Sequence, residues 1–198
     1  MSSTSKYIQY NFKLSSRSIS FSEPGNYSKN FPQPQKTSLS LDIFDPDTYT
    51  DSKHTRVLHQ SYWDFGKTFI FSKVKGTLYI TVVLFRSYQN DLDLEKEDQF
   101  SKAIQLDFNK NNPKQDIKDY GITPPEEFKL ITINRIQWVH YVYDVGGEKK
   151  FIYTIPLSEH HYLKVNLNFI DNSPGEKNNW KEHATSTMNQ IMSSFKIN

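Results

Sequence analysis

The feature that most restricts the fold of this chain is a two-residue alternation of apolar and polar side chains. In residues 7–14 (YIQYNFKL) every second side chain from Ile8 to Leu14 is apolar, and Ile19 and Phe21 resume the pattern after a Ser-Ser break. Alternation with this period is typical of β-strands with one buried face. The N-terminal part is therefore expected to form two strands, at 7–14 and 17–21.

The same argument predicts a dense β region between residues 57 and 87. Strands are expected at 57–65, 68–72 and 76–86, with 73–76 as a hairpin connection. In the run 76–86 both alternating sets of side chains are mostly apolar, which favours a central strand covered on both sides. A short strand at 38–44 is also expected, ahead of a turn at Asp45-Pro46-Asp47.

The second half predicts a meander and two helices. A long strand at 129–145, a turn at Gly146-Gly147, and strands at 149–156 and 162–170 form the meander. Apolar residues from Phe100 to Phe108 and from Trp180 to Phe195 recur at helical spacing. We therefore predict one α+β domain, 1–198, with an antiparallel sheet, two main helices packed on it, the order ββ-βββ-α-βββ-α, and a loop-rich insertion at 22–56.

Composition limits the partners and the cellular location. The chain has no cysteine, which excludes disulfides, thiol chemistry and Cys-ligated zinc. Its net charge is +2, with 24 Lys and Arg against 22 Asp and Glu, so nucleic acid is not an expected partner. The first twenty residues contain no apolar run typical of a secretory signal, and no stretch is long enough to span a membrane. We expect a cytoplasmic protein.

Motifs for catalysis, cofactors and metals are missing from the sequence. The six histidines do not form a zinc-binding pair, and the Asp45–Asp51 segment lacks the spacing of a calcium loop. There is no glycine-rich phosphate loop and no Gly-x-Ser-x-Gly elbow. We therefore name no catalytic, cofactor-binding or metal-binding residue and expect a protein that is not an enzyme.

Aromatic side chains are the one marked excess, with 14 Phe, 12 Tyr and 3 Trp. Several stand among polar neighbours, and tyrosine and tryptophan are enriched at protein interfaces. We predict a protein-binding surface from two such groups, with an aromatic-rich core as the alternative interpretation and the acidic segment 91–98 as a second candidate contact. The candidate residues are Tyr62, Trp63, Trp138, His140, Tyr141 and Tyr143.

The end of the chain resembles a known family. The segments YLKVNLNFID (162–171) and NWKEHATSTMNQIMSSFKIN (179–198) resemble the last strand and closing amphipathic helix of the PsbP-like two-layer α+β domains. The similarity covers the architecture of somewhat more than half of the chain, and the N-terminal strands and the 22–56 insertion depart from it. It implies a binding module, such as a chaperone or a secretion-system accessory protein. The chain also resembles small bacterial immunity proteins that neutralise a secreted toxin.

The function predicted from the sequence is protein binding without catalysis. The partner expected first is a toxin effector, as in type VI secretion, with this chain as its immunity protein or adaptor. One alternative is an enzyme or small-ligand-binding protein that uses a pocket between sheet and helices, with His140 or His59 as its polar group. Another is an accessory subunit of an envelope or secretion machine. The sequence does not define the oligomeric state.

Overall fold

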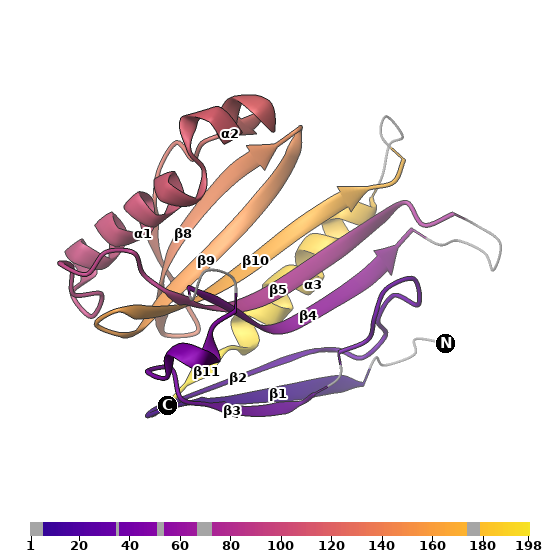
Figure 1. Ribbon diagram of the computed structural model, residues 1–198. Helices are drawn as coiled ribbons and strands as arrows, with labels where there is room; N and C mark the ends of the chain where they lie inside the picture. Colours follow the sequence, from indigo (N-terminus) through magenta and orange to yellow (C-terminus); the bar gives the residue numbers. More distant parts are fainter. Residues whose placement is uncertain (1–5, 35, 51–53, 67–72, 174–178) are drawn as a thin grey trace.

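The computed structural model describes residues 6–34, 36–50, 54–66, 73–173 and 179–198. Its elements are β1 (Tyr7–Leu14), β2 (Arg17–Pro24), β3 (Ser38–Leu41), the short 3-10 helix η1 (Pro46–Thr48), β4 (Thr55–Phe65), β5 (Gly76–Arg86), α1 (Glu97–Asn111), α2 (Lys114–Asp119), β6 (Ile122–Thr123), β7 (Lys129–Ile133), β8 (Ile136–Val145), β9 (Glu148–Ser158), β10 (His161–Asp171), α3 (Trp180–Ser194) and β11 (Lys196–Ile197). The predicted α+β class is confirmed (Figure 1). The expected strand at 68–72 lies outside the described residues.

The strands form two sheets. A seven-stranded sheet has the order β4-β5-β10-β9-β8-β6, with β7 also paired to β8, and its neighbouring strands are all antiparallel. The predicted turn at Gly146-Gly147 joins β8 to β9, and both glycines have a positive φ, which glycine adopts without steric cost.

The predicted single strand at 129–145 is wrong, because the structure divides it into β7 and β8. Asn134 and Arg135 form the turn between them, with φ values of 50° and 64°. Two consecutive left-handed residues give the tight hairpin turn whose twist matches antiparallel strands. The segment is apolar on both sides of this turn, and the alternation therefore concealed the break.

The second sheet has four strands in the order β11-β2-β1-β3. β1 and β2 form the predicted N-terminal hairpin, β3 runs parallel to β1, and β11 pairs with β2. The expected Asp45-Pro46-Asp47 turn is η1, in which the Asp45 carboxylate accepts a hydrogen bond from the Asp47 amide. The sequence left open whether the N-terminal strands join the main sheet, and the structure places them in this second sheet.

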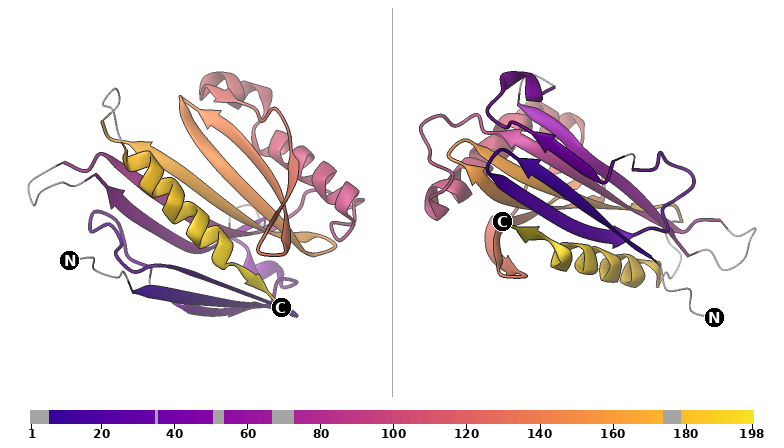
Figure 2. Two further views of the ribbon diagram at one scale, coloured as in Figure 1. Left: turned by 180° about the vertical axis from the view of Figure 1, so that it is seen from behind. Right: turned by 90° about the horizontal axis from the view of Figure 1, so that it is seen from below.

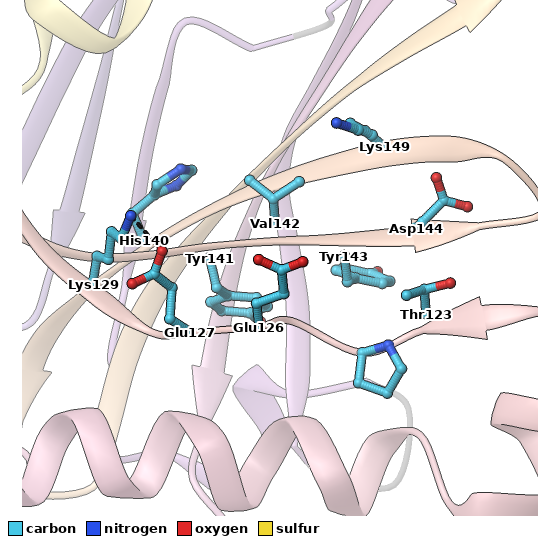
Figure 3. Close-up of a pocket in the computed structure, with 11 residues that line it drawn as sticks. Thr123, Glu126, Glu127, Lys129, His140, Tyr141, Val142, Tyr143, Asp144 and Lys149 are labelled. Atoms are coloured by element: carbon cyan, nitrogen blue, oxygen red, sulfur yellow. Dashed lines mark ion pairs between the residues drawn. The ribbon is translucent and has the colours of Figure 1, made fainter.

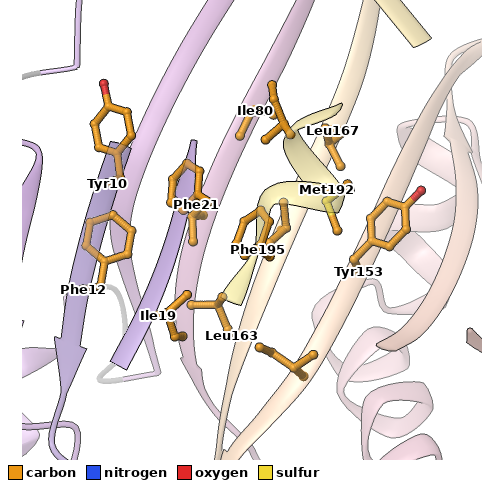
Figure 4. Close-up of a cluster of buried hydrophobic side chains, with 14 of the residues drawn as sticks. Tyr10, Phe12, Ile19, Phe21, Ile80, Tyr153, Leu163, Leu167, Met192 and Phe195 are labelled. Atoms are coloured by element: carbon orange, nitrogen blue, oxygen red, sulfur yellow. The ribbon is translucent and has the colours of Figure 1, made fainter. Parts of the chain in front are cut away.

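The main core lies between the two sheets and α3. The inner face of the four-stranded sheet, the back face of the seven-stranded sheet and the apolar stripe of α3 enclose it (Figures 2 and 4). Phe195 stands where the three meet: its ring stacks on Phe21 at 4.7 Å between centroids and meets Trp138 edge-on at 5.5 Å. The Ser194 hydroxyl holds the end of α3 to the backbone of Ser22.

A smaller core lies on the front face of the seven-stranded sheet, under α1. Phe100, Ile104 and Phe108 of α1 pack there against Tyr141 of β8 and Tyr162 of β10. α1 and α3 therefore cover opposite faces of this sheet (Figure 2). In Figure 1, which looks onto the front face, no helix crosses β5 and β10 in front of the sheet, and α3 lies behind them.

Candidate functional site: the open face of the seven-stranded sheet

Three of the six predicted contact residues are core residues. Trp63 is 2% exposed, Trp138 0% and Tyr141 3%. The two-residue period directs Trp63 and Trp138 to the back face, against α3 and the four-stranded sheet, and Tyr141 to the front face beneath Phe108. The prediction that these three form a docking surface is therefore wrong, since a partner reaches them only if the fold opens. The alternative of an aromatic-rich core describes them correctly.

The other three, Tyr62, His140 and Tyr143, are half-buried and lie in different places. Tyr62 is on the front face of β4. His140 stacks on Tyr153 at 4.4 Å and donates its Nδ1 hydrogen to the Ile152 carbonyl at 2.8 Å. Burial lowers the pKa of His140. The six candidates therefore do not make one surface.

His140 and Tyr143 line a pocket of about 300 Å³ at the outer edge of β8 (Figure 3). It exists because β6 and β7 pair with the two ends of β8, while residues 124–128 between them are not in a strand. Pro124 and Pro125 open that segment, and proline has no N–H to donate to a neighbouring strand.

The charges in this pocket nearly cancel. Glu127 is paired with Lys129, and the Asp144 carboxylate accepts a hydrogen bond from the amide of Gly147. Among the described lining residues, no nucleophile is hydrogen-bonded to a general base. The pocket can hold a small polar molecule, but the arrangement does not indicate a reaction.

His59, the other histidine considered for a ligand site, belongs to a buried polar group with Glu23 and Ser61. One Glu23 oxygen is 2.9 Å from His59 Nε2, and the other accepts from the Ser61 hydroxyl at 3.0 Å. The side chains of His59 and Glu23 are 2% and 0% exposed. His59 Nε2 is also 3.3 Å from the Ser61 hydroxyl, and the whole group is closed off from solvent, so no substrate reaches it. The group therefore joins the two sheets and is not a catalytic triad.

The more distinctive surface is the part of the front face that α1 leaves uncovered. We call its central part the open face, and the strand register arranges this part in three rows across the sheet. The first row is Tyr62, Tyr79, Asn168 and Lys150; the second is Gln60, Thr81 and Asn166; the third is Val57, Val83 and Lys164. A further row beyond them, Asp64, Thr77 and Ile170, borders the open face at the end away from Lys164. Thr81 and Val83 are short and buried between longer neighbours, and the polar and aromatic side chains around them are half-buried or exposed.

An aromatic stack forms one side of the open face. The rings of Phe31 and Tyr62 are stacked at 4.2 Å between centroids, and those of Tyr62 and Tyr79 at 4.5 Å. Gln60 Nε2 donates to the Tyr79 hydroxyl at 3.0 Å, and burial raises the pKa of Tyr62 to about 12. Each ring is therefore held in place by its neighbours.

A polar row along β10 forms the middle of the open face. β10 is a central strand whose back-facing side chains, Leu163, Val165 and Leu167, are fully buried, whereas Lys164, Asn166 and Asn168 face forward. The alternation of apolar and polar residues in YLKVNLNFID indicates that these polar side chains share one face of the strand. That this strand is central and that this part of its front face is uncovered depends on the order of the strands in the sheet, which the sequence does not show.

The described residues show neither a metal-binding cluster nor a membrane-spanning helix. They contain no cluster of His, Cys, Asp or Glu able to hold a metal ion, and none of their helices is long and apolar enough to cross a membrane.

Comparisons with known proteins find a distant structural likeness. No protein-family model matches the chain, and no curated protein matches it. LpqN, a protein involved in cell envelope biogenesis of Mycobacterium tuberculosis, has a solved structure that aligns with a TM-score of 0.41 and 12% sequence identity, covering 96% of this chain and 91% of that one. At these values the likeness carries no argument about fold family or function.

Proposed function

We propose that this chain is a non-catalytic protein that binds another protein through the open face, as the immunity protein or adaptor of a secreted toxin. The observation that carries the proposal is the pairing of a stacked, pre-positioned Tyr62–Tyr79 platform with a half-buried polar row on a central strand. Tyrosine provides a large contact area at small entropic cost, and it is enriched at interfaces.

The architecture around the face supports rigid docking. The open face belongs to the sheet whose back is anchored by α3 and the main core. Partners that bind through pre-organised surfaces lose little conformational entropy, so a modest area can give high affinity. Neutralising a toxin requires such tight binding and needs no chemistry from the binder.

The test starts from affinity purification of the tagged chain from its source organism, with mass spectrometry of what co-purifies. The captured partner is then expressed and titrated calorimetrically against Tyr79→Ala. Truncating a central aromatic contact is expected to weaken binding by about thirtyfold, the size of a typical hot spot. Tyr120→Ala is the matched control, because Tyr120 is 66% exposed and caps the C-terminal end of α2, outside the open face.

Two results would count against the proposal: no stoichiometric partner, or a partner that binds Tyr79→Ala and the control equally. The toxin assignment has a separate readout. Expression of the captured partner is expected to arrest growth, and co-expression of this chain is expected to restore it.

The pocket at the edge of β8 supports a second candidate, a small-ligand-binding protein. Its volume of about 300 Å³ is at the lower end of the range of ligand sites. A polar metabolite that raises the melting temperature of the wild-type chain but not of His140→Ala would favour this candidate.

A further inference from the structure

Lys164 is in an environment that does not satisfy its ammonium group. It lies in the middle of β10, between Val83 of β5 and Thr154 of β9, and its side chain is half-buried. It makes no hydrogen bond or ion pair with the described residues. Lysines are rarely withdrawn from water without a partner, because transferring an unpaired charge from water is costly.

The acid that acts electrostatically on Lys164 does not form an ion pair with it. Asp107 of α1 accepts hydrogen bonds at Oδ1 from the Tyr88 amide and from Gln89 Nε2, each at 3.2 Å. Its Oδ2 is buried and accepts no hydrogen bond from Lys164 or from any other described residue. The attraction of Asp107 does not offset the burial of the lysine, and the pKa of Lys164 falls to about 8. Near neutral pH the group is still mostly charged and lacks an acceptor.

The residues of the open face include two lysines, Lys150 and Lys164. Lys150 forms an ion pair with Glu148 at 2.9 Å, whereas Lys164 has no ion pair with the described residues. A carboxylate placed over the face would therefore meet its charge complement at Lys164.

Two asparagines extend the polar row beyond Lys164. The Asn168 side-chain oxygen is buried and accepts no hydrogen bond from the described residues, and Asn166 lies between it and Lys164 on the same face. Four residues along a strand span ~13 Å. That length matches an extended peptide segment, whose N–H and C=O groups suit asparagine amides, and it exceeds the reach of a single small anion.

From this placement we infer that the open face docks an acidic segment of the partner protein, with a carboxylate on the Lys164 ammonium and the backbone of the segment along Asn166 and Asn168. This inference rests on the proposed function and specifies the chemistry of the partner. The Tyr62–Tyr79 stack borders the same row and would contact side chains that flank the acidic residue.

The test uses short poly-L-glutamate as the probe and ¹⁵N NMR of the full chain as the readout. We expect the shift changes to centre on 164–168 and 79–83. Lys164→Met, which retains the apolar stem, is expected to weaken binding about tenfold or more, the effect of losing one charge-assisted contact. Lys13→Met is the matched control, since Lys13 is an exposed strand lysine on the other sheet, and it should bind like the wild type.

The inference is overturned if Lys164→Met binds the probe as the wild type does, or if the shifts centre elsewhere. It is also overturned if inorganic phosphate binds at Lys164 as tightly as the peptide, because the face would then hold a small anion and not a segment. Thermal melting and spectral dispersion confirm that both variants are folded.

The two proposals fail separately. If no protein partner is captured but the peptide binds at 164–168, the proposed function is wrong and the acidic-segment site remains. If a partner is captured and its affinity is the same for wild type and Lys164→Met, the protein-binding function remains and the Lys164 site is wrong.

Discussion

Replacing Lys164 by methionine is expected to stabilise the folded chain. Burial of the Lys164 ammonium costs desolvation free energy that the attraction of Asp107 does not offset. Methionine fills a similar volume without a charge. A pKa of about 8 in place of the ordinary 10.5 sets a ceiling of ~3 kcal/mol at ~1.4 kcal/mol per pKa unit. Because the side chain is partly solvated, we expect a gain of ~1–2 kcal/mol at neutral pH.

The stability difference between Lys164→Met and the wild type is expected to depend on pH. Below pH 8 both folded and unfolded chains hold the proton, so the folded chain bears the full cost of the buried charge. Between about pH 8 and 10 the folded chain releases the proton while the unfolded chain keeps it, and the wild-type free energy of unfolding rises relative to that of the variant. The advantage of Lys164→Met should therefore shrink as the pH increases through this window.

Urea unfolding followed by tryptophan fluorescence measures the effect, since Trp63, Trp138 and Trp180 are all buried. The comparison is made between variant and wild type at each pH, which cancels the titration of the tyrosines shared by both. A variant that is less stable at neutral pH, or a difference that does not change between pH 8 and 10, would refute the account of Lys164 as an uncompensated charge.

Three further predictions concern the scaffold. Glu23→Ala is expected to cost ~3–5 kcal/mol, because it removes the carboxylate that accepts from both buried partners, His59 and Ser61, and leaves them only their long 3.3 Å contact with each other. In a double-mutant cycle, additive losses for Glu23→Ala and His59→Ala would show that the two side chains do not interact. Phe195→Ala is expected to cost ~3–5 kcal/mol by calorimetry, since its ring joins both sheets to α3, and a loss below 1 kcal/mol would contradict that role. Arg135→Gly should stabilise the chain by ~0.5–1 kcal/mol in chemical denaturation, as glycine relieves the positive φ of the β7–β8 turn, and destabilisation would show that the arginine side chain matters more.

The sequence predicted those elements whose signal is local. The hairpin of β1 and β2, the turn at Gly146-Gly147 and the stripe of α3 follow from periodicity and turn chemistry within a few residues. The division of the strands into two sheets did not follow, because the pairing of β11 with β2 joins residues far apart in the chain. Alternation specifies that a strand has two faces but not what covers each of them.

Because alternation does not specify what covers each face of a strand, the sequence also did not identify the open face. Trp63 and Trp138 look like contact residues because polar residues such as Asp64 and Gln137 adjoin them in the sequence, yet adjoining residues of a strand occupy its opposite face. Conversely, Lys164, Asn166 and Asn168 are ordinary polar residues in sequence. Their significance depends on β10 being central and on α1 covering β10 only at Tyr162, and both are properties of the three-dimensional arrangement.

The pairing of β11 with β2 also has a consequence for folding kinetics. The Ser22 amide bonds to the Ser194 hydroxyl across 172 positions of the chain, and Ile19 of β2 faces Ile197 of β11. Contacts of such long sequence separation slow folding, because the loop they close must be ordered before it gains any stabilisation. The N-terminal hairpin has local contacts, so we expect it to form early and to expose its apolar face until the C-terminal helix docks. During synthesis this face is open to misassociation, and the chain is expected to depend on chaperones for that interval.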